Sequence, residues 1–419
     1  MNLQNLSRHK FSIIGLPLFS IGLIMVMLTS GIPSAAAASK KPPTRTPTPV
    51  IVPTATPTSQ PTPTPGSGPH WQVIPSPDIG TVSRLEDVAV ISANDIWAVG
   101  QAGVSTLTLH WNGTQWSIVP SPNVTGNGVQ NDLRGVAAMA PNDVWAVGAT
   151  ADPNISYGWK TLIMHWDGRQ WSIVPSPNLP ELGTCNSLQA VAAISSTDIW
   201  AVGGIPQGYC GSSKAILMHW DGSAWTIVPA PAETALWNSS TRFGVAAVAS
   251  NDVWTFGDGE PFHWDGTQWS VILGGAGNYG KAAAAGANSI WTVGSYIEYD
   301  GYTYFGPFTK AIYWDGTRWG GAPPISPTGN DTFSGVAAIA PNDFWAVGRS
   351  GKFTLTEHWD GANWSVVPSA NGNPNPGSNL VVANELHAVA AVSSTNVWAV
   401  GYFVDNTSGF SHALILQYK

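Results

Sequence analysis

The chain has 419 residues, of which 43% are hydrophobic and 10% are charged, and its formal net charge is −8. A nucleic-acid-binding protein normally carries a basic patch, and none is visible here, so nucleic acid is not an expected partner. The 22 Trp, 45 Gly and 33 Pro residues favour an all-β protein with many turns.

Residues 1–38 have the layout of a secretory signal peptide. A short basic stretch, MNLQNLSRHK, precedes the apolar run FSIIGLPLFSIGLIMVMLTSGI, and small residues follow. We predict cleavage near Ala36–Ala38. The alternative is an uncleaved membrane anchor, because an apolar run of this length can span a bilayer.

Residues 39–67 are rich in Pro and Thr and read SKKPPTRTPTPVIVPTATPTSQPTPTPGS. Proline fixes φ and favours polyproline II, so we expect a stiff, extended stalk or linker without a core. A Ser/Thr/Pro composition is typical of O-glycosylated stalks. We therefore expect a secreted or cell-surface protein whose globular part begins near residue 68.

After the stalk, a run of the type N-D-x-W-A-V-G occurs seven times. Its tryptophans are Trp97, Trp145, Trp200, Trp254, Trp291, Trp345 and Trp398. A repeat of about 50 residues is typical of β-propeller blades.

Each copy divides into four short strands, as the second copy illustrates. Strands A and B, LRGVAAMA (133–140) and VWAVG (144–148), flank a Pro-Asn-Asp turn, and strands C and D, TLIMHWD (161–167) and WSIVP (171–175), flank an Asp-Gly turn. Asp-Gly is a strong hairpin signal. The small residues of the first strand suit the innermost position around a central channel.

The first six copies end in a hairpin with two tryptophans, whereas the seventh ends at HALILQYK, without its fourth strand. The stretch HWQVIPSP at 70–77 matches the missing strand, because the same pattern ends the first two copies as QWSIVPSP. We therefore predict one domain over 68–419, an all-β seven-bladed propeller that the N-terminal strand closes.

The pattern V-W-A-V-G … H-W-D-G-x-x-W resembles kelch-like propellers of the galactose-oxidase central-domain type, and so implies a secreted, bacterial-type repeat protein. The W-D-G-x-x-W hairpin is also similar to propeller lectins and, more loosely, to the Asp-box of sialidases, whereas WD40 repeats match poorly. Kelch repeats usually carry Gly-Gly, which occurs here only at Gly203–Gly204. The resemblance to kelch-like copper oxidases fails at the metal ligands, so we expect no cofactor.

Five histidines precede the strand-C tryptophan: His110, His165, His219, His263 and His358. Equivalent positions in neighbouring blades lie roughly 10 Å apart, so these histidines cannot share a metal ion. We expect them to pack and to form hydrogen bonds. The aspartates of the first turn, such as Asp95 and Asp143, are expected to cap the turn backbone.

The copies differ most in length between strands B and C and between strands D and A, and both kinds of loop lie on one face of a propeller. Strand A starts at the rim of that face with Glu86, Arg134, Gln189, Phe243, Gly280, Ser334 and His387, and the next position holds Asp87 in blade one and Lys281 in blade five. A ring of unlike polar groups around a funnel predicts a site for a small polar ligand. The alternative is a solvated channel mouth.

Aromatic residues outside the repeat pattern fall in the variable loops. Trp159 and Trp237 are two of them, and the loop 295–308 contains Tyr302 and five further aromatic residues. Exposed aromatic rings indicate stacking on sugars or a protein interface. The alternative is a loop folded over its own small cluster.

Cys185 and Cys210 are the only cysteines, and both lie in variable-face loops of the third blade. Because a secreted chain meets an oxidising environment, we predict a disulfide between them.

No motif of a hydrolase nucleophile, zinc protease or P-loop occurs, and no pair of carboxylates is marked as catalytic. The favoured hypothesis is a non-enzymatic, monomeric binding propeller that recognises a glycan or an extracellular protein through its variable face. The ligand-binding candidates are Glu86, Asp87, Arg134, Gln189, Phe243, Lys281, His387, Trp237 and Tyr302. The alternative is a glycan-active enzyme, a hydrolase or lyase, with its site at the funnel.

Overall fold

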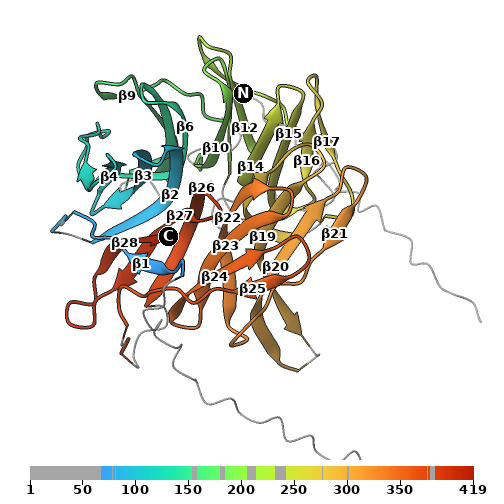
Figure 1. Ribbon diagram of the computed structural model, residues 1–419. Coiled ribbons are helices and arrows are strands. Elements are labelled where there is room, and N and C mark those ends of the chain that lie inside the picture. Colours follow the sequence, from blue (N-terminus) through green and yellow to red (C-terminus); the bar gives the residue numbers. More distant parts are fainter. Residues whose placement is uncertain are drawn as a thin grey trace, which may run out of the picture. The chain divides into compact units, whose positions relative to one another are not determined.

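Seven four-stranded antiparallel blades surround a central channel in the computed structural model (Figure 1). The structure describes residues 68–419 except 78, 81, 153–157, 180–184, 205–213, 232–241, 276, 300–301, 375 and 378–382. The predicted fold is thus confirmed. The predicted signal peptide and stalk lie outside the described residues, and all described residues belong to one unit, Pro57–Lys419. Within this part of the chain no helix is long and apolar enough to cross a membrane.

Each blade runs outward from the channel in strand order A, B, C, D. The A strands are β2 (Ser83–Ser92), β6 (Gln130–Ala140), β10 (Leu188–Ser195), β14 (Arg242–Ala249), β18 (Gly277–Ala284), β22 (Asp331–Ala340) and β26 (Asn384–Ser393). The B strands are β3 (Asp95–Ala102), β7 (Asp143–Asp152), β11 (Asp198–Gly203), β15 (Asp252–Gly259), β19 (Ile290–Tyr299), β23 (Asp343–Ser350) and β27 (Asn396–Val404).

The two outer strands of each blade form the Asp-Gly or Asn-Gly hairpin, except in blade seven. The C strands are β4 (Ser105–Trp111), β8 (Gly158–Trp166), β12 (Ile216–Trp220), β16 (Phe262–Trp264), β20 (Tyr304–Trp314), β24 (Phe353–Trp359) and β28 (Ser411–Tyr418). The D strands are β5 (Trp116–Ile118), β9 (Trp171–Ile173), β13 (Trp225–Ile227), β17 (Trp269–Val271), β21 (Trp319–Gly321), β25 (Trp364–Val366) and β1 (Trp71–Val73).

The N-terminal strand β1 completes the last blade, as the sequence predicts. Trp71 pairs with Tyr418 and Val73 with Leu416 in an antiparallel ladder. The backbone hydrogen bond from the His70 amide to the Lys419 carbonyl measures 2.9 Å. This pairing covers the edge that strand C of blade seven would otherwise expose.

Tryptophans join each blade to the next. The strand-B indole of one blade packs against the strand-C and strand-D indoles of the following blade, as Trp145 does with Trp220 at 4.9 Å and Trp225 at 5.6 Å between ring centroids. At the closure, Trp345 of blade six meets Tyr418 at 4.7 Å and Trp71 at 5.4 Å. Trp71 therefore supplies the strand-D aromatic ring that the seventh copy lacks.

The repeated histidines are bound within their own blades. In five blades His Nε2 lies 2.8–3.0 Å from Oδ1 of the turn aspartate, as between His110 and Asp95. The predicted hydrogen bonding of these histidines is confirmed, but the aspartate binds the imidazole and not, as predicted, the turn backbone. Backbone capping occurs instead at the second hairpin turn, where Asp167 Oδ1 accepts hydrogen bonds from the amides of Arg169 and Gln170.

Blade seven makes an equivalent contact with different residues, because the Gln417 amide donates to Asn396 Oδ1 at 3.1 Å. In all six of these blades the hydrogen bond links strand C to the A–B turn. The imidazole also packs on the strand-B indole, with 4.6 Å between the ring centroids of His110 and Trp97. Both facts indicate a structural role for the repeated histidines. No group of three or more potential metal ligands occurs among the described residues.

A β-bulge interrupts strand A at the channel rim of the blades. In blade two Leu133 pairs with Gly148 and Gly135 with Val147, so Arg134 between them has no partner across the ladder. The other blades shift register at the equivalent place, and blade five does so across two residues, Gly280 and Lys281. A bulge aims its extra side chain away from the regular ladder, here toward the channel mouth.

The glycine that ends V-W-A-V-G makes room for this bulge. A Cβ atom on Gly148 would collide with the Asp132 carbonyl oxygen and would lie 2.9 Å from Leu133 Cα. We expect Gly148→Ala to lower the free energy of unfolding by about 1–3 kcal/mol, measured by chemical denaturation, because the backbone must shift.

Gly321→Ala is the matched control, because no atom lies within 4 Å of its added Cβ. Equal stability of the two variants would contradict the proposed role of Gly148.

Candidate functional site

The residues at the seven bulges surround one cavity at the channel mouth, which we call the cup. Its volume is about 270 Å³. The cup is lined by Glu86, Arg134, Gln189, Phe243, Gly280, Ser334 and His387, the seven residues that the repeat alignment places at the rim, and by Lys281, Phe333 and Glu385. The sequence thus identifies the lining correctly, whereas ligand binding there stays a prediction.

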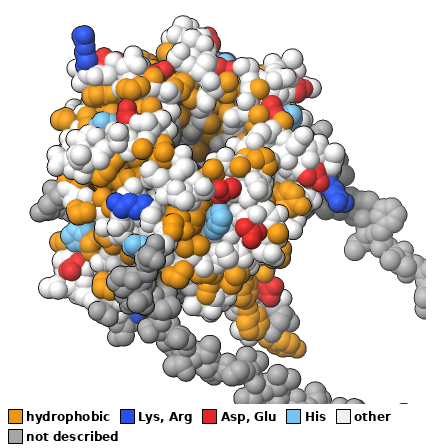
Figure 2. Space-filling model, viewed as in Figure 1, with side chains coloured by type: hydrophobic (Ala, Val, Ile, Leu, Met, Phe, Trp, Pro, Cys, Tyr) orange, Lys and Arg blue, Asp and Glu red, His pale blue; other side chains and the backbone are white. Residues whose placement is uncertain are grey.

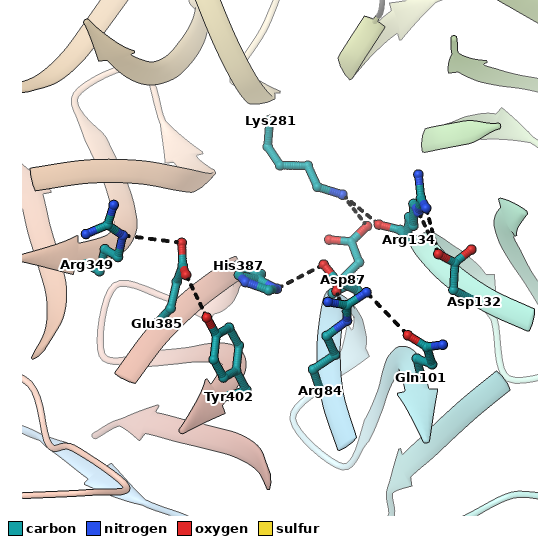
Figure 3. A network of polar contacts seen from close by, with 11 residues as sticks. Arg84, Asp87, Gln101, Asp132, Arg134, Lys281, Arg349, Glu385, His387 and Tyr402 are labelled. Carbon is teal, nitrogen blue, oxygen red and sulfur yellow. Dashed lines mark hydrogen bonds and ion pairs between the residues drawn. The ribbon is translucent and has the colours of Figure 1, made fainter. Parts of the chain in front are cut away.

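A salt bridge across the channel lies at this end of the propeller. Lys281 Nζ of blade five lies 3.1 Å from Asp87 Oδ2 of blade one and donates to the Arg134 carbonyl at 3.1 Å (Figure 3). Asp87 Oδ2 also accepts the Val136 amide at 2.9 Å. Both charged residues line a second cavity of about 170 Å³, whose other walls are mainly Val and Ala of the A strands, and of the two only Lys281 lines the cup. The two candidates therefore bind each other as well as bordering the channel.

Glu86 and His387 form an ion pair on one wall of the cup. His387 Nδ1 lies 2.9 Å from Glu86 Oε2, although off the line of a hydrogen bond, and Arg84 Nε lies 2.9 Å from the other carboxylate oxygen. Burial raises the pKa of Glu86, but the charges of His387, Arg84 and Arg134 outweigh this effect and lower the pKa to about 2. Burial lowers the pKa of His387, but Glu86 outweighs it and raises the pKa. Both shifts favour the charged forms of the two side chains.

Arg134 is held in position by neighbours in its own blade and in blade three. Its Nε and Nη2 atoms donate to Asp132 Oδ2 at 3.0 and 2.7 Å, and Nη1 donates to Ser187 Oγ at 2.8 Å. Gln189 donates to the same Ser187 hydroxyl at 3.2 Å. Two planar polar side chains thus enter the cup in fixed orientations.

Glu385 and Phe333 line the cup although the repeat alignment does not place them at the rim. Phe333 lies one residue before its rim position and Glu385 two residues before, within β22 and β26. Glu385 accepts a hydrogen bond from the Tyr402 hydroxyl at 3.1 Å and lies 3.8 Å from Arg349 Nε (Figure 3). Phe333 is only 4% exposed and packs in the core beside Trp364, whereas Phe243 is partly exposed to the cup.

A second polar ring in the sequence is the signal that could have found Glu385. The position two residues before the rim is polar in every copy: Arg84, Asp132, Ser187, Thr241, Asn278, Thr332 and Glu385. Arg84, Asp132, Ser187 and Glu385 contact rim or neighbouring polar side chains. Alternate residues of a strand share a face, so this second ring could have been predicted with the first.

Trp159 was expected in a loop but lies on β8, within reach of the cup. Its indole ring faces the Arg134 guanidinium, whose carbon lies 5.1 Å from the ring centroid. Its carbonyl accepts a hydrogen bond from the Asn186 amide at 2.9 Å, and its backbone bridges to Cys185. Trp159 is therefore anchored beside Arg134.

The aromatic segment of blade five is a hairpin and not, as expected, a loop. Tyr299 pairs with Tyr304 across β19 and β20, and their rings stack at 4.5 Å. Tyr302 is 94% exposed and is not among the residues that line the cup. The hairpin projects from the ring in Figure 1, and Figure 2 shows hydrophobic side chains along it. The candidates therefore do not form a single site.

Two sequence predictions lie outside the described residues. Trp237 belongs to the range 232–241 and Cys210 to the range 205–213. Cys185 itself is buried. A role for Trp237 and the disulfide between Cys185 and Cys210 stay predictions.

Several solved structures are similar to this chain. YCF48 bound to D1 peptide has 15% identity and a TM-score of 0.50, with 84% of this chain and 96% of that chain covered. A protein of unknown function from Dyadobacter fermentans has 11% identity and a TM-score of 0.50, with 84% and 98% covered. The GH74 xyloglucanase from Xanthomonas campestris has 14% identity and a TM-score of 0.53, with 83% and 55% covered.

At these identities the likeness extends to the propeller fold alone. No protein-family profile matches the sequence, and no curated protein matches it. The kelch-like assignment is therefore not confirmed.

Proposed function

We propose that this protein is a non-enzymatic binding propeller, secreted or displayed on a cell surface, that recognises a glycan in the cup. The observation that carries the proposal is the convergence of unlike rim side chains on one cavity. Phe243 supplies aromatic surface, and Arg134 and Gln189 supply planar polar groups. Aromatic surface combined with oriented hydrogen-bonding groups is the usual composition of a small-ligand site.

The charges in the cup favour binding over catalysis. Glu86 has a pKa of about 2, so it cannot donate a proton near neutral pH. Arg134, Lys281 and His387 each contact a carboxylate of the protein. A glycan-active hydrolase or lyase at the funnel remains the alternative, and the xyloglucanase of similar fold is the reason to test it.

A protein partner is the second candidate, and the projecting hairpin of blade five favours it. Tyr302 and Tyr304 are 94% and 74% exposed. Large exposed aromatic groups often mark protein interfaces. The similar structure of YCF48 contains a bound peptide.

Secretion and the kelch-like relationship belong to the same proposal. They rest on the apolar N-terminal run, the Pro/Thr-rich segment and the repeated V-W-A-V-G pattern.

The test is a glycan array followed by calorimetry with the glycans that bind. We expect Arg134→Ala and Phe243→Ala each to weaken binding by about 1–3 kcal/mol, because a buried polar partner or an aromatic anchor is lost. Arg318→Ala is the control, because Arg318 lies on the C–D turn of blade five with its side chain 84% exposed.

Binding that is equally tight in the two cup variants would place the glycan elsewhere. Release of shorter sugars from a bound glycan would favour the enzyme alternative. No binding to any glycan would contradict the proposal and leave the protein partner.

A further inference from the structure

A further cavity opens beside the cup, between blades one and two, and we call it the lateral pocket. Its volume is about 140 Å³. Arg84 and Gln101 line it from blade one, and Asp132 and Arg134 line it from blade two (Figure 3). All these residues are polar, and Arg134 also borders the cup. The two cavities are therefore neighbours that share one side chain.

The apolar surface of the lateral pocket comes from Trp159 and two small residues. Ala149 and Ala151, on β7, leave room that larger side chains would fill. Trp159 is half-buried and anchored through its backbone to Asn186 and Cys185. It does not belong to the strand-B, strand-C or strand-D tryptophans that join the blades, so the repeat architecture does not require an indole here.

The polar groups are held in place before any ligand arrives. Arg84 Nη2 donates to Gln101 Oε1 at 3.3 Å, and Asp132 Oδ1 accepts the Ala149 amide at 3.1 Å. Asp132 Oδ2 lies 2.7 Å from Arg134 Nη2, and Glu86 Oε1 lies 2.9 Å from Arg84 Nε, so each arginine has a carboxylate that balances its charge. This balance favours a neutral ligand over a polyanion, because a polyanion would have to compete with both carboxylates.

We propose that the lateral pocket is a second sugar subsite, so that the ligand is a neutral oligosaccharide of at least two units that passes Arg134. A pyranose ring has an apolar C–H face, which packs on an indole, and hydroxyl groups at its edge, which bond to guanidinium, amide and carboxylate groups. The lateral pocket offers one aromatic wall, the indole of Trp159, together with guanidinium, amide and carboxylate groups that can bind sugar hydroxyls. The inference rests on the proposed glycan function and adds the length of the ligand and the place of its second unit.

The experiment compares each monosaccharide with its di- and trisaccharide, using calorimetry on the full propeller. The probes are β-1,4-linked glucose, xylose and mannose and α-1,4-linked glucose. For a sugar that binds, we expect the affinity to rise about tenfold or more from one unit to three. Trp159→Ala should abolish most of this rise. Phe243→Ala should weaken all lengths alike.

Ala151→Leu tests the same site without removing an anchored side chain, because leucine should fill part of the lateral pocket. It should also abolish the rise, and Trp159→Phe should retain part of it. A rise that persists in both Trp159→Ala and Ala151→Leu, or a wild-type protein that binds all lengths equally, would overturn the second subsite while leaving the cup. Failure of every monosaccharide and oligosaccharide to bind would overturn the proposed function itself and this inference with it.

Discussion

Deletion of residues 68–77 is expected to abolish cooperative unfolding or to cause aggregation. The deletion removes β1 and with it Trp71, which is 1% exposed and packs on Trp345 of blade six. It also leaves the backbone of β28 without a partner along one edge. Seven blades form a closed ring only when the last one is complete, so the loss affects the seam between blades six and seven as well as one hairpin.

The measurement is thermal unfolding followed by circular dichroism, together with light scattering. Deletion of residues 39–67 alone is the matched control and should leave the melting temperature unchanged, because it spares β1. A protein without residues 68–77 that stays monomeric and melts at the wild-type temperature would refute closure by β1.

The second large effect is a loss of stability at alkaline pH caused by Glu357. This residue of β24 is fully buried, and its Oε2 atom accepts the Ile325 amide at 3.0 Å, while Oε1 has no hydrogen-bond partner. The equivalent strand-C positions of the other blades are apolar: Leu109, Met164, Met218, Phe262, Ile312 and Leu416. Burial raises the pKa of Glu357 to about 8. The hydrogen bond from the Ile325 amide lowers the pKa, and the nearby charge of Asp331 raises it further.

A raised pKa means that the folded protein holds a proton that the unfolded chain releases. The contribution of Glu357 to stability is therefore fully present below the ordinary glutamate pKa and is lost as pH rises through about 8. The loss should be on the order of 3–5 kcal/mol between about pH 4 and pH 9. Glu357→Gln keeps an acceptor for the Ile325 amide and cannot ionise, so its unfolding free energy should lack this decline.

Chemical denaturation of wild type and Glu357→Gln across this pH range measures the difference. Glu298→Gln is the matched control, because Glu298 is exposed on the hairpin of blade five. If the unfolding free energies of wild type and Glu357→Gln run parallel across the whole range, Glu357 is not the group responsible.

The fold and the cup were predictable because the chain contains seven copies of one unit. Aligning the copies gives the strand order, assigns Trp71 to the missing strand and places Arg134 and His387 at equivalent rim positions. The same alignment also sets Glu357 among apolar residues, which marks it as an exception within strand C. Residues shared by every copy and residues that break the pattern are both visible in such a sequence.

Several partners of the rim residues were harder to predict, because they lie in other blades. The contact between Lys281 and Asp87 joins blades that are not neighbours in sequence, and the position of Trp159 depends on the extension of β8 beyond the repeat. The tyrosine hairpin was expected as a loop because its length is unique to blade five. Its β-forming residues, rather than any repeated pattern, extend the two strands.

The bulge at the start of strand A gives this propeller an unusual freedom to diversify. At Arg134 the ladder resumes on both sides of the unpaired residue, so a new side chain there need not disturb the pairing. The seven copies already display this, because Glu, Arg, Gln, Phe, Gly, Ser and His occupy the same backbone position. Rim residues can therefore be replaced without a change in strand pairing, although Glu86 and His387 must be replaced together because they form an ion pair. A library randomised at these positions should yield receptors with new specificities.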